Sequence, residues 1–273
     1  ELNLKKSVEE YEQYRGVIVI GEAVKLSRKI IKNLKENTDL IKKAVTVGST
    51  RRRQAIINNI DILLISDFYQ ELINYFEKLS WVKELKEDGE IISVVSEEGL
   101  KINFIIADKK NPTCLLQHFT GAKAHNNKLI QYAADRGYQL EKDGLFREGH
   151  KIKLKDETDL YNELNLNYII PELREDRGEI KAAASNNLPQ SITLKDIKGD
   201  LHVHSKDSDG AYTLTEMVTA ARRRDYEYLA ITDHSQSLKV AQGMSVETLN
   251  RQQDKINKVQ QKFDDFKIIK GIE

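Results

Sequence analysis

The sequence predicts a mixed α+β layer, followed by a second region of parallel β/α units. Up to about residue 111, helix-like and strand-like segments are mixed, and the apolar runs EIISVV and KINFIIA flank a short SEEG turn typical of a hairpin. After about residue 197, strand and helix alternate, which favours a parallel sheet or barrel. A chain of 273 residues with 40% hydrophobic side chains can bury more than one core, so we expect two or three domains.

The first part should begin with helices that pack on the sheet. Ser7 and Glu10 have the spacing of a capping box and predict a short helix over 7–15. Apolar residues recur at helical spacing over 22–36, which predicts a longer helix with one buried face. The other elements expected before the hairpin are strands over 43–49 and 59–66 and a helix over 68–79.

The middle of the chain, from 112 to about 168, has a helical pattern. One helix is expected within 126–140, with Gly137 as its stop signal, and another over 157–166. The segment 178–196 is rich in small and polar residues and contains a proline, so we interpret it as a linker.

The last part should contain three strands and two helices, with any chemistry at the carboxyl ends of the strands. Thr213 with Glu216, and separately Ser245, are helix-capping signals. The expected strands cover 199–204, 226–234 and 266–273, and the expected helices cover 213–225 and 245–263.

Composition limits the classes of function. Lysine plus arginine (43) balances aspartate plus glutamate (43), so attraction to nucleic acid must come from local basic patches. The single cysteine, Cys114, cannot form an internal disulfide and is expected to be a small buried side chain in a cytoplasmic protein. No apolar run is long enough for a membrane span. The chain lacks an initial methionine and stops in an apolar run, so we expect it to be a piece of a longer protein.

Histidines and acids gather at three predicted strand ends. His202 and His204 lie two residues apart on a strand and therefore point to the same face. Asp233 and His234 end the next strand, and Glu273 ends the third. In a parallel layout these side chains converge on one rim, which predicts a divalent-cation site.

The motifs DLHVHS, SDG, ITDH and GIE resemble those of the PHP (polymerase and histidinol phosphatase) domain, a barrel that holds several metal ions and hydrolyses phosphoesters. The resemblance implies that Glu273 bridges two ions, that zinc or manganese is bound, and that further ligands follow residue 273. Bound ions of this kind activate water as a nucleophile at neutral pH. The implied ligands are His202, His204, Asp209, His234 and Glu273.

The segments VGSTRR, IDILL, KINFIIA, HFTGAKAHN and PELREDRGEI resemble, in this order, the palm and thumb of the bacterial family X DNA polymerases. The implied fold is an α+β palm and a helical thumb of the nucleotidyltransferase type, followed by the first β/α units of a PHP-type barrel. The implied domains are the end of a fingers-like helical region (1–20), palm (21–111), thumb (112–177), linker (178–196) and PHP segment (197–273).

The same resemblance assigns a nucleotide site. Gly48 and Ser49 would bring backbone and hydroxyl donors to phosphates, and Arg52 can pair with phosphate oxygens in bidentate fashion. Within HFTGAKAHN, the resemblance places Phe119 and Gly121 at the sugar and Asn126 near the base edge of an incoming nucleotide.

The family's three metal-binding aspartates correspond here to Asn59, Asp61 and Asn103, so one carboxylate remains. Two-metal phosphoryl transfer needs several carboxylates to offset two divalent cations, here Mg²⁺ or Mn²⁺ if the palm is occupied. Asn103 also stands where the resemblance implies the carboxylate that activates the primer 3′ hydroxyl, and an amide accepts no proton at pH 7. Templated nucleotide addition is therefore expected to be impaired.

The favoured hypothesis is a monomeric DNA repair protein whose palm and thumb bind gapped or 3′-ended DNA, with dNTP as a further ligand, while its PHP domain removes nucleotides or phosphate from 3′ ends. One alternative is an active gap-filling polymerase in which Asp67 or Asp108 compensates for the lost acids. A second is a non-catalytic scaffold that binds DNA ends. A third is a phosphoesterase that acts on small molecules.

Overall fold

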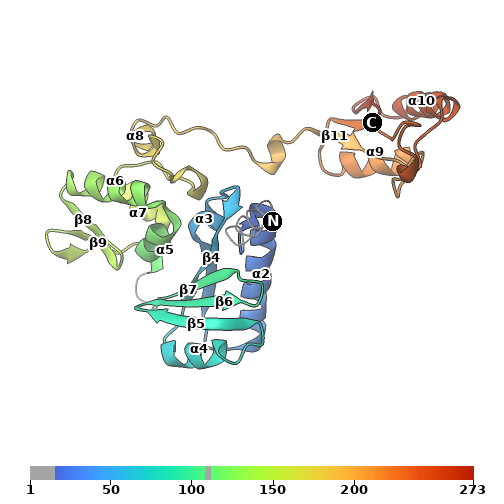
Figure 1. Ribbon diagram of the computed structural model, residues 1–273. Coiled ribbons are helices and arrows are strands. Elements are labelled where there is room, and N and C mark those ends of the chain that lie inside the picture. The colour runs from blue at the N-terminus through green and yellow to red at the C-terminus, as the bar shows by residue number, and fades with distance from the viewer. Residues whose placement is uncertain (1–15, 108–111) are drawn as a thin grey trace, which may run out of the picture. The chain divides into compact units, whose positions relative to one another are not determined.

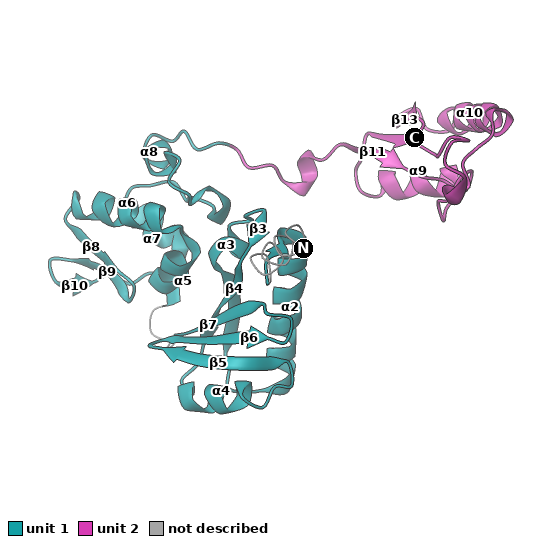
Figure 2. Ribbon diagram, in the orientation of Figure 1, with its two compact units in different colours: residues 1–189 teal, residues 190–273 magenta. Residues whose placement is uncertain are grey.

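The chain divides into two compact units, Glu1–Pro189 and Gln190–Glu273 (Figure 2). Within them, the computed structural model describes residues 16–107 and 112–273. The division falls inside the segment predicted as a linker, whereas the helix predicted over 7–15 lies outside the described residues. In the described part of the chain, no helix is both long enough and apolar enough to cross a membrane.

Unit 1 is built on a five-stranded mixed sheet with the order β2–β4–β7–β6–β5 (Figure 1). β4 and β7 run parallel, and the other neighbours are antiparallel. The predicted hairpin is confirmed as β6 and β7. The strands are β2 (Lys43–Val47), β4 (Asn59–Ile65), β5 (Val82–Asp88), β6 (Ile91–Ser96) and β7 (Lys101–Ala107), and a small separate ladder joins β1 (Ile18–Val19) to β3 (Ile56–Ile57).

The strict alternation of side chains along β4 and β7 gives the sheet two different faces. Ile60 and Ile62 of β4 and Phe104 of β7 belong to the main core, together with the apolar faces of α2 (Ile20–Asn37) and α4 (Tyr69–Phe76). Leu63 and Ile105 point to the other face, where they form a smaller core with α5 (Pro112–Thr120). Phe76 and Phe104 stack with their ring centroids 4.3 Å apart, which fixes α4 on the sheet.

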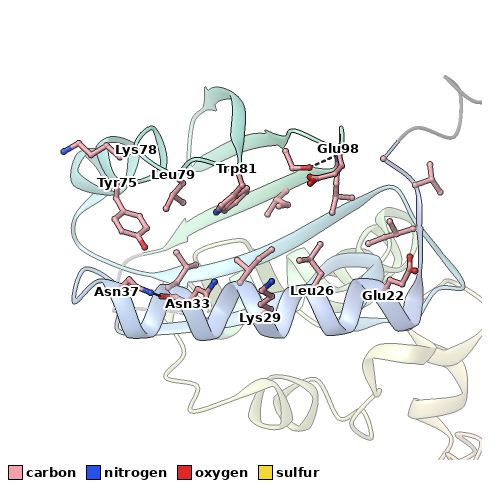
Figure 3. A pocket seen from close by; sticks show the side chains of 18 residues that line it. Glu22, Leu26, Lys29, Asn33, Asn37, Tyr75, Lys78, Leu79, Trp81 and Glu98 are labelled. Atoms are coloured by element: carbon pink, nitrogen blue, oxygen red, sulfur yellow. Dashed lines mark hydrogen bonds between the residues drawn. The ribbon is translucent and has the colours of Figure 1, made fainter.

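An apolar cleft of about 950 Å³ lies between α2 and the segment that joins α4 to β5. Figure 3 shows Leu26 and Asn33 on the α2 side and Leu79 and Trp81 opposite them. The cleft belongs to the core face of the sheet, because Leu34 and Ile102 also line it.

The second half of unit 1 is less helical than the sequence pattern predicted. A helical pattern was expected throughout 112–168, but 138–151 forms an antiparallel meander, so the expectation is wrong there. These strands are only two to four residues long, too short to show a period of two clearly, and Leu140 and Leu145 anchor them to the core. The edge strand β5 was also missed, since most of its side chains are exposed. The meander consists of β8 (Tyr138–Glu141), β9 (Gly144–Arg147) and β10 (His150–Lys151).

Helices enclose a separate core beside this meander. The predicted helices are confirmed as α6 (Lys123–Ala134) and α7 (Glu157–Glu163), and Asp156 caps α7 by accepting a hydrogen bond from the Asp159 backbone N–H. Cys114 is buried in this core, as expected, and burial raises the pKa of its thiol to about 11.

The segment predicted as a linker contains a packed helix, α8 (Glu179–Ala184), before its exposed part. Ile180 and Ala183 of α8 lie in the same core as α6 and α7. Glu179 accepts hydrogen bonds from the backbone N–H groups of Asp176 and Arg177 and lies 2.5 Å from Nδ1 of the buried His125. The exposed connection therefore starts after α8, and it contains the 3₁₀ turn Leu194–Asp196.

A buried ion network joins the two halves of unit 1. Arg174 is fully buried and donates to Glu157 and to the carbonyl oxygen of Ile169, and Arg51 donates to Glu157 at 2.5 Å from the side of the sheet. Burial alone would raise the pKa of Glu157, but the hydrogen bonds and charges of the two arginines outweigh it and hold that pKa below its ordinary value.

Unit 2 is a three-stranded parallel sheet with the order β11–β12–β13 and two helices, as the alternating pattern predicted. Thr213 and Glu216 form the expected capping box, and Ser245 caps the second helix. The elements are β11 (Gly199–Val203), α9 (Leu214–Arg222), β12 (Tyr228–Ile231), α10 (Val246–Gln260) and β13 (Lys267–Lys270). They correspond to the first β/α units of a PHP-type fold, without a closed barrel.

Replacing Glu157 by glutamine should destabilise unit 1 by about 3–5 kcal/mol at pH 7, because Arg174 would keep a buried charge without its carboxylate. Urea unfolding followed by the fluorescence of Trp81, the one tryptophan of the chain, measures this loss. The folded-state pKa of Glu157 is depressed, so its stabilisation is complete above the unfolded pKa of about 4.3 and is lost as the pH falls through the folded value. The difference from wild type should therefore shrink below about pH 4. Glu90→Gln, which removes an exposed pair with Lys142, is the matched control and should cost less than about 1 kcal/mol.

Candidate functional site

A row of polar side chains crosses the sheet of unit 1 near the start of β4 and β7. Asp61 is paired with Asn103 on β7, and Asn103 is paired with Ser93 on β6. Asn59 precedes Asp61 by two positions, so it points to the same face of the sheet. This face is opposite to the one that α2 and α4 cover, and the structure therefore brings together the three positions at which the sequence predicted metal ligands.

The three predicted positions are joined by hydrogen bonds. Nδ2 of Asn59 and Nδ2 of Asn103 both donate to the same oxygen, Oδ1 of Asp61, at 2.6 and 2.7 Å. Ser93 donates its hydroxyl to Oδ1 of Asn103 at 2.8 Å. Burial raises the pKa of Asp61 above its ordinary value, and the two amide hydrogen bonds oppose this shift only in part.

The acids proposed to compensate for the missing carboxylates do not join this row. Asp67 follows the opposite end of β4, roughly 20 Å from Asp61 at 3.3 Å per residue, and it pairs with Lys42. Asp108 lies outside the described residues. Across 16–107 and 112–273, both groups of side chains that could hold a metal ion lie in unit 2.

The turn after β2 lies against this row. Gly48 has a φ of +62°, and a Cβ at this position would come within 2.2 Å of Oδ2 of Asp61. Glycine is therefore required for both the backbone conformation and the close approach. Ser49 follows on the short helix α3 (Gly48–Arg51) and is half-buried.

Arg52, the predicted phosphate-binding residue, contacts the second half of unit 1. Its Nε donates to Glu175 at 2.5 Å, and its guanidinium also donates to the carbonyl oxygen of Thr120 at 2.8 Å. Gln54 donates to the same Glu175 oxygen at 2.7 Å. A phosphate that binds Arg52 must therefore compete with the Glu175 carboxylate, which sequence reasoning did not single out.

The predicted sugar and base contacts lie at the end of α5. Phe119 packs against the small core beneath the sheet, and Gly121 is held so closely that a Cβ would lie 2.3 Å from Oδ1 of Asn126. Asn126 is buried, accepts from Gln117, and donates to the carbonyl oxygen of His118 at 2.6 Å. The amide of Asn126 thus braces the loop, and Asn126 also lines a pocket with Gln117 and His118, so its contact with a base edge stays a prediction.

In unit 2, all five predicted metal ligands gather at the carboxyl ends of the parallel strands. Oε2 of Glu273 lies 3.0 Å from Nε2 of His202, 3.3 Å from Nε2 of His204 and 3.4 Å from Nδ1 of His234. Asp209 lies 3.3 Å from Nδ1 of His204 and 3.5 Å from Nε2 of His234. The hydrogen bond with His202 is the main cause that lowers the pKa of Glu273.

The donor set of this cluster fits divalent cations. Three imidazoles and two carboxylates form two overlapping groups whose ligand atoms lie within 4.8 Å of one another. Nδ1 of His204 and Nδ1 of His234 are buried and, within the described part of the chain, have no hydrogen-bond partner. Their lone pairs are therefore available to a metal such as zinc or manganese.

Asp233 supports the cluster from behind and does not line it. It is fully buried, and its two oxygens accept hydrogen bonds from the backbone N–H and hydroxyl of Ser205 and from the side chains of Ser208 and Gln252. These bonds fix the loop that carries Asp209. Gly210 completes the loop, since a Cβ there would lie 2.4 Å from the carbonyl oxygen of His204.

Comparisons with known proteins agree with this arrangement. The family model for the DNA polymerase beta thumb matches residues 115–175, and the model for the PHP domain matches residues 200–273. The chain is 35% identical over 260 residues to "DNA polymerase/3'-5' exonuclease PolX" of Bacillus subtilis. The matched region covers 93% of this chain and 45% of that protein. It is 29% identical over 147 residues to "Repair DNA polymerase X" of African swine fever virus, covering 50% of this chain and 83% of the viral protein.

Among solved structures, a ternary complex of Leishmania infantum polymerase beta matches with a TM-score of 0.55 and 18% sequence identity, covering 61% of this chain and 80% of that one. This likeness concerns the fold. A polymerase beta thumb and a PHP segment follow each other in the predicted order, and the Bacillus relative matches along 93% of the chain. The chain therefore combines a polymerase beta thumb with a PHP domain and is similar over 93% of its length to a bacterial polymerase of the X type, of which it spans about half.

Proposed function

We propose that this chain is part of a DNA repair protein in which the PHP domain removes nucleotides or phosphate from DNA 3′ ends, while the palm and thumb bind DNA but add nucleotides poorly or not at all. The observation that carries the proposal is the contrast between the two sites. The cluster in unit 2 gathers five side chains that could hold metal ions, whereas the palm has one carboxylate between two amides.

The PHP cluster supports metal-dependent hydrolysis. His202, His204, His234, Asp209 and Glu273 would hold divalent ions, which would supply an activated water and neutralise charge on the phosphoryl oxygens. Asp233 would position the Asp209 loop through its hydrogen bonds to Ser205 and Ser208. The Bacillus relative is named as a 3′-5′ exonuclease, which supports DNA ends as the substrate over small phosphorylated molecules.

Gap-filling polymerisation is the second candidate, because the names of the Bacillus and viral relatives both include a DNA polymerase. Its chemistry requires a base for the primer hydroxyl and enough carboxylates to hold two cations. The amides of Asn59 and Asn103 supply neither a proton acceptor nor negative charge. This candidate is therefore disfavoured by the geometry of the palm.

The test of the proposed function uses this chain and a version that continues to the length of the Bacillus relative, each incubated with Mn²⁺, dNTPs and a gapped DNA whose primer carries a label. The longer protein should shorten the primer and not extend it. His202→Ala with His204→Ala should reduce shortening by about 100-fold or more, since loss of supporting groups alone costs 10–100-fold at metal sites.

His150→Ala is the matched control, because His150 is exposed on β10 of unit 1 and should leave shortening unchanged. Primer extension that depends on Asp61 would refute the proposal in favour of the polymerase. Absence of both reactions, with DNA binding retained, would favour a non-catalytic scaffold.

A second expectation concerns the phosphate-binding arginine. Replacing Glu175 by glutamine should strengthen dNTP binding about 3- to 10-fold, because Arg52 loses the carboxylate that competes with phosphate. Titration of a fluorescent dATP measures the affinity. Glu172→Gln removes the same charge at an exposed position nearby and should have little effect. Equal gains in both variants would show that net charge, and not the Arg52–Glu175 pair, controls binding.

A further inference from the structure

One oxygen of the Asp61 carboxylate accepts two hydrogen bonds, and the other lies against the turn at Gly48. Oδ1 accepts the two amide N–H groups of Asn59 and Asn103, and Oδ2 lies against Gly48 so closely that no Cβ fits between them. A metal ligand needs an oxygen lone pair directed at the cation. Here the lone pairs of Oδ1 are directed at amide hydrogens.

The orientation of the amides follows from their neighbours. If Asn103 were flipped, its oxygen would lie 2.7 Å from Oδ1 of Asp61, and two acceptors would face each other. Asn59 is subject to the same argument at 2.6 Å. The hydroxyl of Ser93 donates to the far side of the Asn103 amide and supports this orientation. The four side chains thus form a continuous hydrogen-bonded row across β6, β7 and β4.

The charges of the row, like its hydrogen bonds, disfavour a pair of metal ions. One carboxylate with two neutral amides carries a single negative charge, where two divalent cations bring about +4. For a cation to share Oδ1 of Asp61, both amides must give up their bonds to that oxygen and turn their own oxygens inward, and Asn103 must also give up its bond from Ser93. The residues present therefore do not fit the metal pair that the family implies.

We infer that the palm is a metal-independent structure in which Asn59 and Asn103 occupy the place of cations, and that Asp61 serves as a buried hydrogen-bond acceptor that ties β4 to β7. The inference deepens the proposed loss of templated addition and names its physical cause. Binding of DNA or nucleotide by such a palm would need no divalent ion.

The test is made in the full chain with His202, His204 and His234 all replaced by alanine, so that Mn²⁺ binding in unit 2 is disabled. In this background the palm should bind no Mn²⁺ when free Mn²⁺ is counted by electron paramagnetic resonance. Its melting temperature should be the same in EDTA and in Mn²⁺.

Adding Asn59→Asp and Asn103→Asp should reverse both results. Three carboxylates would then lie within hydrogen-bonding distance of one another, so the melting temperature in EDTA should fall by roughly 5 °C or more. Mn²⁺ should restore it, with one or two ions bound per chain. Asn33→Asp with Asn250→Asp adds the same two charges at exposed positions and should show neither effect.

The inference is overturned if the palm with Asn59 and Asn103 intact binds Mn²⁺ and loses it on Asp61→Ala. It is also overturned if binding of a 3′-tailed DNA, measured by fluorescence anisotropy in the same background, is lost in EDTA. Neither result depends on the exonuclease assay, because the histidines of unit 2 are absent throughout. Failure of the proposed hydrolysis would therefore leave this inference standing, and the reverse holds as well.

Discussion

The parallel pairing of β4 with β7 is the constraint on which unit 1 depends. Its register places Ile62 beside Phe104 on one face and Asp61 beside Asn103 on the other. A shift of one residue would turn apolar side chains toward solvent and polar ones into the core, so burial of the core face fixes the register. The polar row is a consequence of that register, although its residues are 42 positions apart in the chain.

The same sheet also accounts for the position of the turn at Gly48 and Ser49, which the sequence predicted to bind phosphate. β2 pairs with β4 so that Val47 lies beside Asp61, and the turn after β2 must therefore pass directly over the carboxylate. Gly48 allows that approach, and the chain then continues into Arg51 and Arg52. Both arginines bind acids of the thumb, so the loop serves as a mechanical joint between sheet and thumb as well as a candidate phosphate site.

In unit 2, strand pairing also gathers polar side chains at one place, but these side chains fit cations. Three parallel strands end at one edge, and that edge receives His202, His204, His234 and Glu273 without the neutral partners that satisfy Asp61 in the palm. Buried imidazole nitrogens that face carboxylate oxygens suit a site for cations, whereas a carboxylate oxygen that already accepts two amide hydrogen bonds does not. The described part of the chain thus holds one cluster whose side chains fit metal ions and one polar row whose side chains bond to one another.

The family resemblance pointed to Asp209 and to the shortage of carboxylates in the palm. The sequence by itself determined most of the elements outside 138–151, the helix caps of unit 2 and the position of His202, His204, His234 and Glu273 at strand ends. These are local properties, since periodicity, capping and strand-end position can be read within a few residues. Only the tertiary structure decided what the side chains face. The competition between Glu175 and phosphate for Arg52, the inward turn of Asn126 and the supporting position of Asp233 all depend on partners distant in sequence. The sequence pattern also did not predict the short strands of 138–151. Segments of two to four residues are too short to establish a period, and the surrounding core holds them in place.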